Sequence, residues 1–374
     1  MRRSGNPQDP YLAWGGALAV VLFVLYVYPG VLSPVTSHFD GACQTIPLAA
    51  SAEDIRIDPA TGFAYLSYLD RSPQKNGQKN GKRATGTVML LDLNAATPHV
   101  RAALTTEPAD FRPAGLSLYA PAEGPKRLFV VNRNSLRHHS IEIFEQTSTG
   151  AFAPVESLKD RGLWSPNSIV AVGPRQFYVT NDSGFKERDA ADPLRQTERR
   201  LKDRRSNVLF FDGTRWHVVA EDLNRANGIA VTPDGRTVYV SESSGRRLQV
   251  FDRDLKTGSL KPRERVSVDS VPDNLTVAAN GVVWIGSHPR ALAILRALHD
   301  PGSRAPTQVL KFDPAAPKSQ RVHEVYVNDG TEIAAGTVAA PRDDRFLIGS
   351  LTDHKLLLCK PGARPVITGP EKET

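Results

Sequence analysis

Acidic and amide side chains recur at one position of a repeated sequence pattern, directly before a short run of apolar and β-branched residues. They are Glu53-Asp54, Asn167, Asn227 and Asp273-Asn274. Carboxylate and amide oxygens without thiolates suit a hard cation, and Ca²⁺ takes about six to eight oxygen ligands. Glu53 and Asp273 would supply the negative charge of such a site, while the asparagine oxygens would complete the set. The pattern therefore predicts a calcium site if the fold brings these positions together.

The element that must position them is clearest between residues 227 and 242. This stretch reads as a strand from Gly228 to Val231, a Pro-Asp-Gly turn and a second strand from Thr237 to Ser241. Turn glycines and β-branched strand residues favour this interpretation. Related units begin near residues 54, 115, 167, 274 and 336. Units spaced by roughly 50–60 residues, with about four short strands each, are typical of propeller blades.

The repeats predict an all-β fold, a six-bladed β-propeller. In such a ring the residues before the inner strands converge on one mouth of the central channel. With 374 residues and 40% hydrophobic composition the chain can bury a large core. The net charge is +7, but many basic residues fall in two segments, 71–83 and 186–205. We interpret both as solvated loops, the second as an insertion over one face of the ring, and we predict no nucleic-acid partner.

The N-terminal region carries an apolar segment. No Asp, Glu, Lys or Arg occurs in residues 11–39, and residues 17–28 are almost continuously apolar. A helix needs about 20 apolar residues to span the hydrocarbon core of a bilayer. Arg2 and Arg3 precede the segment, so the positive-inside rule places the N-terminus inside and the folded domain outside. We predict an uncleaved anchor; the alternative is a cleaved signal peptide, although no small-x-small cleavage site follows the run.

These features divide the chain into consecutive parts. We expect a short cytoplasmic N-terminus at residues 1–10, a transmembrane anchor at 11–34, and a linker with a ring-closing strand at 35–52. The propeller then occupies residues 53–362, and a polar tail residues 363–374. The chain is thus predicted to be a single-pass membrane protein with an extracytoplasmic propeller.

The two cysteines, Cys43 and Cys359, lie near opposite ends of the predicted propeller. Closing the ring brings its first and last strands together, so the two residues are expected to lie close in space. In an oxidising compartment the natural interpretation is a disulfide. It would close a very long loop and stabilise the fold by about 4–5 kcal/mol in the chain-entropy model. The alternative is two unrelated buried thiols.

Several segments carry a resemblance to a known family. They are Glu53-Asp54-Ile55, Pro166-Asn-Ser-Ile-Val-Ala-Val-Gly-Pro174, Thr180-Asn-Asp182, Ala226-Asn-Gly-Ile229, Asp273-Asn274 and Trp284-Ile-Gly-Ser-His-Pro289. In these segments the chain resembles the paraoxonase/arylesterase family of six-bladed propellers, within the wider gluconolactonase-like group. The similarity runs from residue 40 to residue 360 and includes the cysteine pair.

The resemblance implies a catalytic Ca²⁺ and the hydrolysis of esters or lactones. The implied ligands are Glu53, Asn167, Asn227, Asp273 and Asn274. A divalent cation polarises the carbonyl group and stabilises the oxyanion, while a base activates water. The candidate catalytic residues are Asp273 and Glu53, as metal-bound carboxylates, and His288.

The chain departs from the family pattern at several positions. The family places histidines where this chain has Ala114 and Arg133, so the pair proposed for proton transfer is absent. Its second, structural calcium uses Asp54, a carbonyl matching Leu116, and an Asp where Ser168 now stands. The serine removes one carboxylate from that second site and puts the ion in doubt. The family's apolar helix for lipid docking corresponds to the second charged segment, so such docking is not expected here.

These observations predict a membrane-anchored, calcium-dependent hydrolase of aryl esters or lactones. Its partners would be a small-molecule ester or lactone and, through the N-terminal helix, the membrane. One alternative is a gluconolactonase-type lactonase that uses another divalent metal. A second is a non-catalytic propeller whose calcium rigidifies a binding surface, an alternative kept open by the missing histidine pair.

Overall fold

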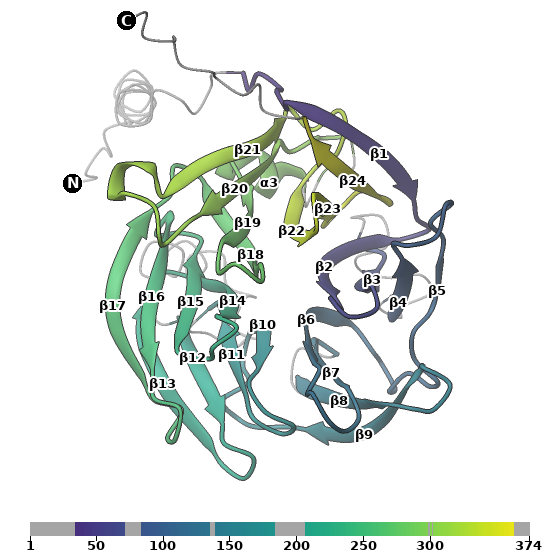
Figure 1. Cartoon of the computed structure of the whole chain (residues 1–374), viewed down its shortest axis with the longest axis vertical. Coiled ribbons are helices and arrows are strands. Elements are labelled where there is room, and N and C mark those ends of the chain that lie inside the picture. The colour runs from purple at the N-terminus through teal and green to yellow at the C-terminus, as the bar shows by residue number, and fades with distance from the viewer. Residues whose placement is uncertain are drawn as a thin grey trace, which may run out of the picture.

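The computed structural model describes residues 34–71, 84–134, 139–183, 206–297, 300 and 302–362, and its regular structure is almost entirely β-strand. Six inner strands surround the centre of a ring, and each packs against the next (Figure 1). They are β2 (Ser51–Ile57), β6 (Pro113–Tyr119), β10 (Pro166–Ala171), β14 (Ala226–Val231), β18 (Val271–Val277) and β22 (Gly336–Arg342).

Three further strands extend each group outward from its inner strand. The second strands are β3 (Phe63–Leu69), β7 (Arg127–Asn132), β11 (Phe177–Asn181), β15 (Thr237–Glu242), β19 (Val283–His288) and β23 (Arg345–Ser350). The third strands are β4 (Thr87–Asp92), β8 (Ser140–Gln146), β12 (Ser206–Phe211), β16 (Arg247–Arg253), β20 (Thr307–Phe312) and β24 (Lys355–Pro361). The outermost strands are β5 (Val100–Ala102), β9 (Phe152–Leu158), β13 (Trp216–Leu223), β17 (Leu260–Ser267), β21 (Val322–Asn328) and β1 (Gly41–Pro47).

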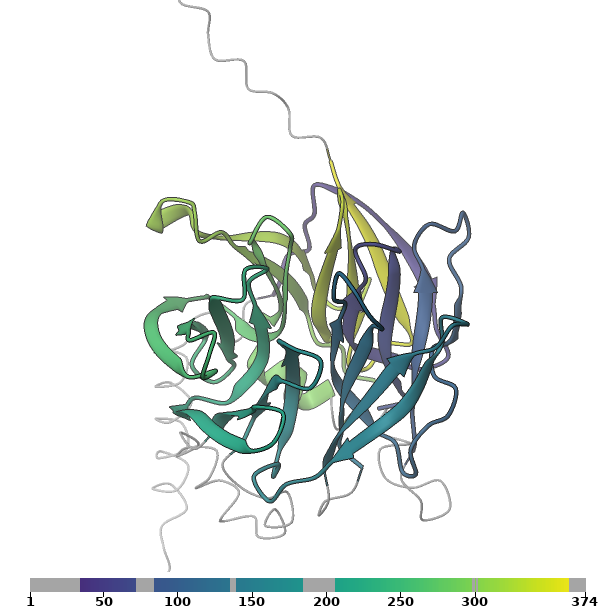
Figure 2. The same cartoon turned by 60° about the horizontal axis from the view of Figure 1, so that its bottom comes forward.

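Four of the six groups are separate four-stranded antiparallel sheets, β6–β9, β10–β13, β14–β17 and β18–β21. The other two, β2–β5 and β22–β24 with β1, join into one sheet only through a bridge between Ala52 and Ser350. A ring of six four-stranded groups is the arrangement of a six-bladed β-propeller, as the repeats predict. Figure 2 shows the twisted groups from a second direction.

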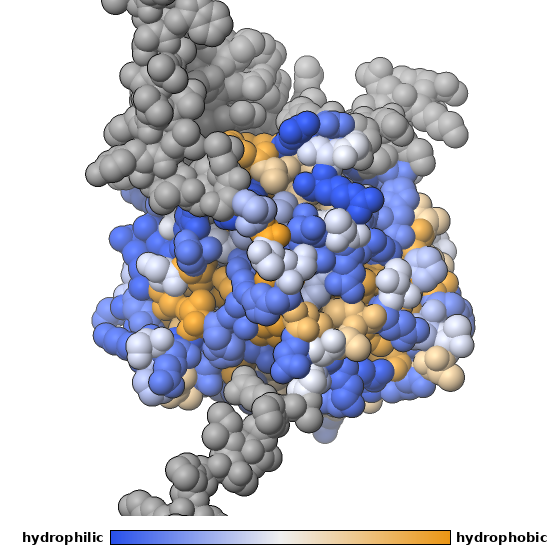
Figure 3. All heavy atoms as spheres, turned by 90° about the horizontal axis from the view of Figure 1, so that it is seen from above, coloured by the Kyte–Doolittle hydropathy of each residue, from blue (hydrophilic) through white to orange (hydrophobic). Residues whose placement is uncertain are grey.

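The core lies within and between the blades. Strands such as β11, β12, β15 and β19 are buried along their whole length, because neighbouring strands and blades cover both faces. An outermost strand such as β17 alternates between exposed and half-buried positions, as expected of a strand with one face in water. Seen edge-on, the described surface mixes hydrophilic residues with smaller apolar areas (Figure 3).

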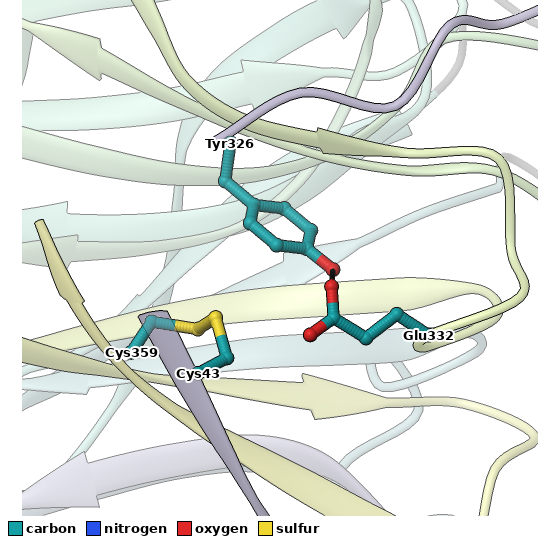
Figure 4. Close-up of a disulfide and its surroundings, with 4 residues drawn as sticks. All are labelled: Cys43, Tyr326, Glu332 and Cys359. Atoms are coloured by element: carbon teal, nitrogen blue, oxygen red, sulfur yellow. Dashed lines mark hydrogen bonds between the residues drawn. A yellow bond between two sulfur atoms is a disulfide. The ribbon is translucent and has the colours of Figure 1, made fainter. Parts of the chain in front are cut away.

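The ring is closed by an early strand that completes the last blade. Strand β1 pairs with β24 in a register that sets Cys43 opposite Cys359, and the two form a disulfide across 316 residues of sequence (Figure 4). The predicted disulfide is therefore confirmed. Nearby, the Tyr326 hydroxyl donates to Oε2 of Glu332 over 2.8 Å.

Helical structure is confined to two short pieces within the described segments. They are α3 (Ala291–Ala297), which the sequence pattern did not reveal, and a 3-10 turn at Lys318–Gln320. None of the helices in the described residues is long and apolar enough to span a bilayer. The expected anchor at residues 11–34 lies outside those residues except for Pro34, as do the expected insertion at 186–205 and nearly all of the loop at 71–83.

All six inner strands change register against their neighbour at the same level. The shifts fall between residues 52 and 55, 113 and 116, 166 and 169, 226 and 229, 272 and 275, and 336 and 338. A β-bulge bends the strand and redirects the side chains within it. Each bulge therefore redirects one or two residues near the start of its inner strand.

Glycines let the inner strands approach each other at this level. A Cβ on Gly228 would lie 2.4 Å from the Asp273 carbonyl oxygen, and one on Gly115 would lie 2.6 Å from the Asn167 carbonyl oxygen. Neither position can accept a side chain without moving the neighbouring backbone. These glycines thus hold the site-bearing strands close together.

Candidate metal centre

The bulges contain every residue that the sequence suggested for the central site. Glu53, Asn167, Asp273 and Asn274 are buried at the bulges of their strands, and Asn227 is half-buried at its own. Asn274 on β18 donates from Nδ2 to the Glu53 carbonyl oxygen on β2 over 3.0 Å. The structure therefore joins two of the predicted residues directly, although 221 positions separate them in sequence.

Two carboxylates of this group lie close enough to repel each other. Burial raises the pKa of Glu53 to about 7; the Arg71 guanidinium opposes the rise, and the charge of Asp273 adds to it. The Glu53 Oε2 atom lies 3.3 Å from Nη2 of Arg71. Two buried carboxylates that repel each other form a site that a further cation would stabilise.

The amide oxygens are the strongest local sign of a ligand. The Oδ1 atoms of Asn167, Asn227 and Asn274 are buried and have no hydrogen-bond partner within the described parts of the chain. A buried acceptor without a donor is costly, so each such atom calls for an explanation. A cation would provide one, since amide and carboxylate oxygens together suit Ca²⁺.

Neighbouring groups orient two of these amides. Nδ2 of Asn274 is held by the Glu53 carbonyl, and Nδ2 of Asn167 donates to Oδ2 of Asp182 over 3.2 Å. Burial alone would raise the pKa of Asp182, but Arg133 and other nearby donors hold it below its ordinary value. Asp182 is therefore ionised and fixes which end of Asn167 faces away from it. In both residues the bonded nitrogen leaves the oxygen available to a ligand.

The residues present thus fit a hard cation. No cluster of three or more His, Cys, Asp or Glu side chains suited to a metal occurs in the described segments. The fit rests instead on two carboxylates, Glu53 and Asp273, combined with the three amide oxygens. Such a mixed set is common for Ca²⁺ and unlike the nitrogen and sulfur sets that bind zinc.

His288 contacts the site through Asp273. Its Nε2 atom lies 2.9 Å from Oδ2 of Asp273. An ionised carboxylate can only accept, so we assign the proton of the neutral imidazole to Nε2. Nδ1 then keeps its lone pair, and it is buried without a partner among the described residues. The histidine is held in place and retains one nitrogen that can accept a proton.

Asp54 has a different environment from its neighbour Glu53. Its Oδ2 atom accepts from the Leu116 amide over 2.7 Å, and its Oδ1 atom accepts from the Ile55 amide over 2.9 Å. Nη1 of Arg56 lies 2.8 Å from the same Oδ1 atom. Burial raises the pKa of Asp54 to about 6, and Arg56 and the two amides limit that rise. Unlike the asparagine oxygens, both oxygens of Asp54 already have partners.

Sequence reasoning placed Arg71 wrongly and missed the role of Asp182. Arg71 was expected in a solvated loop, yet its side chain is only 11% exposed and donates to Glu53 and to the Pro113 carbonyl oxygen. It follows β3 directly, and its length lets it reach back over the blade end. Asp182 follows the end of β11, the strand that pairs with the one bearing Asn167, and this pairing was the available signal.

Comparisons with known proteins agree with the architecture. A sequence profile of the family described as Arylesterase matches residues 42–360. Serum paraoxonase/arylesterase 2 of Bos taurus is 30% identical over 319 residues, covering 84% of this chain and 86% of that protein. Serum paraoxonase/arylesterase 1 of Mus musculus is 29% identical over 369 residues, covering 92% of this chain and 98% of that protein.

Solved structures show the same fold at lower sequence identity. A gluconolactonase of Xanthomonas campestris superposes with a TM-score of 0.50 at 19% identity, over 88% of this chain and 98% of that chain. Regucalcin of Agrobacterium tumefaciens, described as a calcium-binding protein, gives 0.51 at 13% identity, over 88% and 98%. The profile match spans most of the chain and includes every residue of the central site, so this protein belongs to the arylesterase family.

Proposed function

We propose that this protein is a calcium-dependent hydrolase of aryl esters or lactones. The observation that carries the proposal is a set of three buried amide oxygens that lack donors among the described residues and lie in the same bulges of the inner strands as two interacting carboxylates. The names of the relatives, which include paraoxonases, arylesterases and a gluconolactonase, support ester or lactone chemistry at that site.

The ion would be held by residues of four different blades. Glu53 and Asp273 supply charge, and Asn167, Asn227 and Asn274 supply neutral oxygens. A bound Ca²⁺ would polarise the substrate carbonyl and stabilise the negative charge that develops on its oxygen. Arg71 holds one Glu53 oxygen, and Asp182 holds the nitrogen end of Asn167. These contacts fix the ligand oxygens before substrate arrives.

The proton from the attacking water is assigned to His288. Asp273 and Glu53 would hold the ion, whose charge would favour their ionised forms. Asp273 keeps the proton of His288 on Nε2 and leaves Nδ1 as the acceptor. The alternative acceptors are the two carboxylates themselves. A His288→Gln variant that binds calcium normally but hydrolyses at least 100-fold more slowly would support this assignment, a loss in the usual range for general acid–base catalysis.

The test of the function is a hydrolysis screen with the full chain in detergent. Phenyl acetate and aliphatic lactones would be followed before chelation, after EDTA, and after calcium is restored. We expect activity to vanish with EDTA and return with Ca²⁺. Recovery with Zn²⁺ or Mn²⁺ but not Ca²⁺ would favour a lactonase with another metal. Calcium binding without hydrolysis of any of these substrates would favour a non-catalytic binding module.

We also propose that residues 11–34 anchor the propeller to a membrane, with the N-terminus inside. The support is the uncharged, largely apolar run and the two arginines before it. The full-length protein should remain in the membrane fraction after a carbonate wash, with the propeller accessible to protease from the outside. A mature N-terminus near residue 40 would instead identify a cleaved signal peptide.

A further inference from the structure

A buried ion pair joins the inner strands of the first two blades. Arg56 on β2 lies 2.8 Å from Asp54 through Nη1, and its Nε atom donates to the Leu116 carbonyl oxygen on β6 over 2.8 Å. Asp54 in turn accepts from the Leu116 amide over 2.7 Å. Both polar groups of Leu116 are therefore bound by β2. The arginine and the aspartate together cross-link two blades.

The oxygens at this joint resemble a set of cation ligands. The Asp54 carboxylate is fully buried, and it shares Arg56 with a backbone carbonyl. Carboxylate and carbonyl oxygens are typical calcium ligands. Ser168 belongs to the next inner strand, packs against Gly115 beside Leu116, and carries a buried hydroxyl oxygen without a partner within the described segments. The joint thus holds one carboxylate and one carbonyl, and the backbone of a residue with a buried hydroxyl adjoins it.

The Arg56 guanidinium group already contacts both the Asp54 carboxylate and the Leu116 carbonyl oxygen. Its side chain is 14% exposed, so its charge lies largely within the protein. A divalent ion bound to the same two oxygens would lie within a few ångströms of that charge, where repulsion is strong. Only one carboxylate is present to offset three positive charges. The residues at this joint therefore do not fit a metal ion while Arg56 remains in place.

We propose that Arg56 replaces a second, structural cation in this chain. Its guanidinium neutralises Asp54 and ties β2 to β6, so the joint is stable without metal. The chain then binds a single ion, at the central site. Only this count rests on the proposed function; the role of Arg56 at the joint does not.

Stability measured in EDTA tests the arginine alone, because the central ion is then removed. Arg56→Gln should lower the Tm by on the order of 5 °C, since it leaves a buried carboxylate without its counter-ion. Arg56→Lys keeps the charge but cannot bridge both oxygens, so a smaller fall is expected. Arg175→Gln removes a surface pair with Glu156 and serves as the matched control, with little change expected.

Metal stoichiometry tests the replacement. Wild-type protein should retain one calcium per chain after gel filtration, measured by atomic emission. The double variant Arg56→Gln/Ser168→Asp should retain two and gain Tm on calcium addition beyond the wild-type gain, while Ser168→Asp alone should retain one. Two ions in wild-type protein, an unchanged Tm for Arg56→Gln in EDTA, or no additional ion in the double variant would each overturn the proposal. Wild-type protein that binds no ion would contradict the proposed function, while the Tm results would still decide the role of Arg56.

Discussion

Two neighbouring acidic residues on β2, Glu53 and Asp54, have side chains in different environments. Glu53 lies in the central cluster, where asparagine oxygens from three other blades have no donor in the described structure. Asp54 lies at the joint between blades, where two amides and a guanidinium saturate it. The first environment is incomplete without a ligand, whereas the second is complete. Similar residue types therefore form a candidate binding site in one place and hold two blades together in the other.

The largest effect on calcium affinity is expected from Asp273→Ala. It removes one of the two carboxylates of the central cluster, so a bound cation would keep only Glu53 as a negatively charged ligand. Removing one partner of a buried charge pair costs about 3–5 kcal/mol, which is roughly two to three and a half decades in affinity. Calorimetric titration would measure it, with hydrolysis falling in parallel. A loss of less than tenfold would remove Asp273 from the set of ligands.

The next effect is the pH dependence of calcium binding. The pKa of Glu53 rises from an ordinary value of 4.5 to about 7 in the metal-free fold. A raised carboxyl pKa stabilises the fold fully below about pH 4.5, and this contribution is lost as pH rises through 7. Protons therefore compete with calcium below pH 7. Affinity should approach a tenfold fall per pH unit well below pH 7, or on the order of fifteenfold between pH 7 and pH 5.5.

This dependence can be checked with Glu53→Gln, which cannot titrate at that position. Thermal melts with and without calcium should show a larger calcium-induced rise in Tm at pH 8 than at pH 5.5 for the wild type. The variant should show a smaller rise with little pH dependence. The same pH dependence in both proteins would indicate that another group binds the competing proton.

A smaller effect is expected from Asn227→Ala. It removes one neutral oxygen, and water can fill part of the vacated position. We expect affinity to fall by about tenfold, a change of roughly 1.4 kcal/mol. Asn274→Ala should lower the calcium affinity somewhat more, because the Glu53 carbonyl oxygen also loses the hydrogen bond that Asn274 donates to it. An effect as large as that of Asp273→Ala would show that charge does not dominate the cluster.

The smallest effect on affinity is expected from Asp54→Asn, although it should clearly destabilise the fold. The change leaves Arg56 without its buried partner, so Tm should fall by on the order of 5 °C. Calcium affinity at the central site should change less than about threefold, because Asp54 is committed to the joint. A loss of calcium affinity as large as that for Asp273→Ala would show that Asp54 also contributes to the central site. It would contradict the distinction between the Glu53 and Asp54 environments.

The sequence predicted the ring and the central residues because both follow from local patterns. The strand repeats predict the blades, and the acid or amide at the start of four of the repeats predicts which residues belong to the candidate site. The disulfide followed from ring closure alone. These inferences need only strand period, turn residues and the constraint that a propeller must close.

The partners of those residues could not be predicted in the same way. A one-residue register shift decides whether Glu53 or Asp54 faces the channel, and no residue type in the sequence marks it. Arg71 and Arg56 reach their partners through long side chains whose direction depends on neighbouring strands. The short helix α3 has only seven residues, and its exposed leucines at positions 292 and 295 obscure the pattern of the inward face, which Ala293, Ile294 and Ala297 form. Each of these features depends on packing between segments distant in sequence.

The most direct test of the central claim is a calorimetric calcium titration of chelator-stripped, full-length protein in detergent, with phenyl acetate and lactone hydrolysis assayed at each step. We predict that one calcium binds per chain and that hydrolysis rises in proportion to the calcium occupancy. Asp273→Ala serves as the control, in which calcium binding should be much weaker and hydrolysis correspondingly slower. Protein that binds no divalent ion, or that hydrolyses these substrates equally well in EDTA, would contradict this prediction.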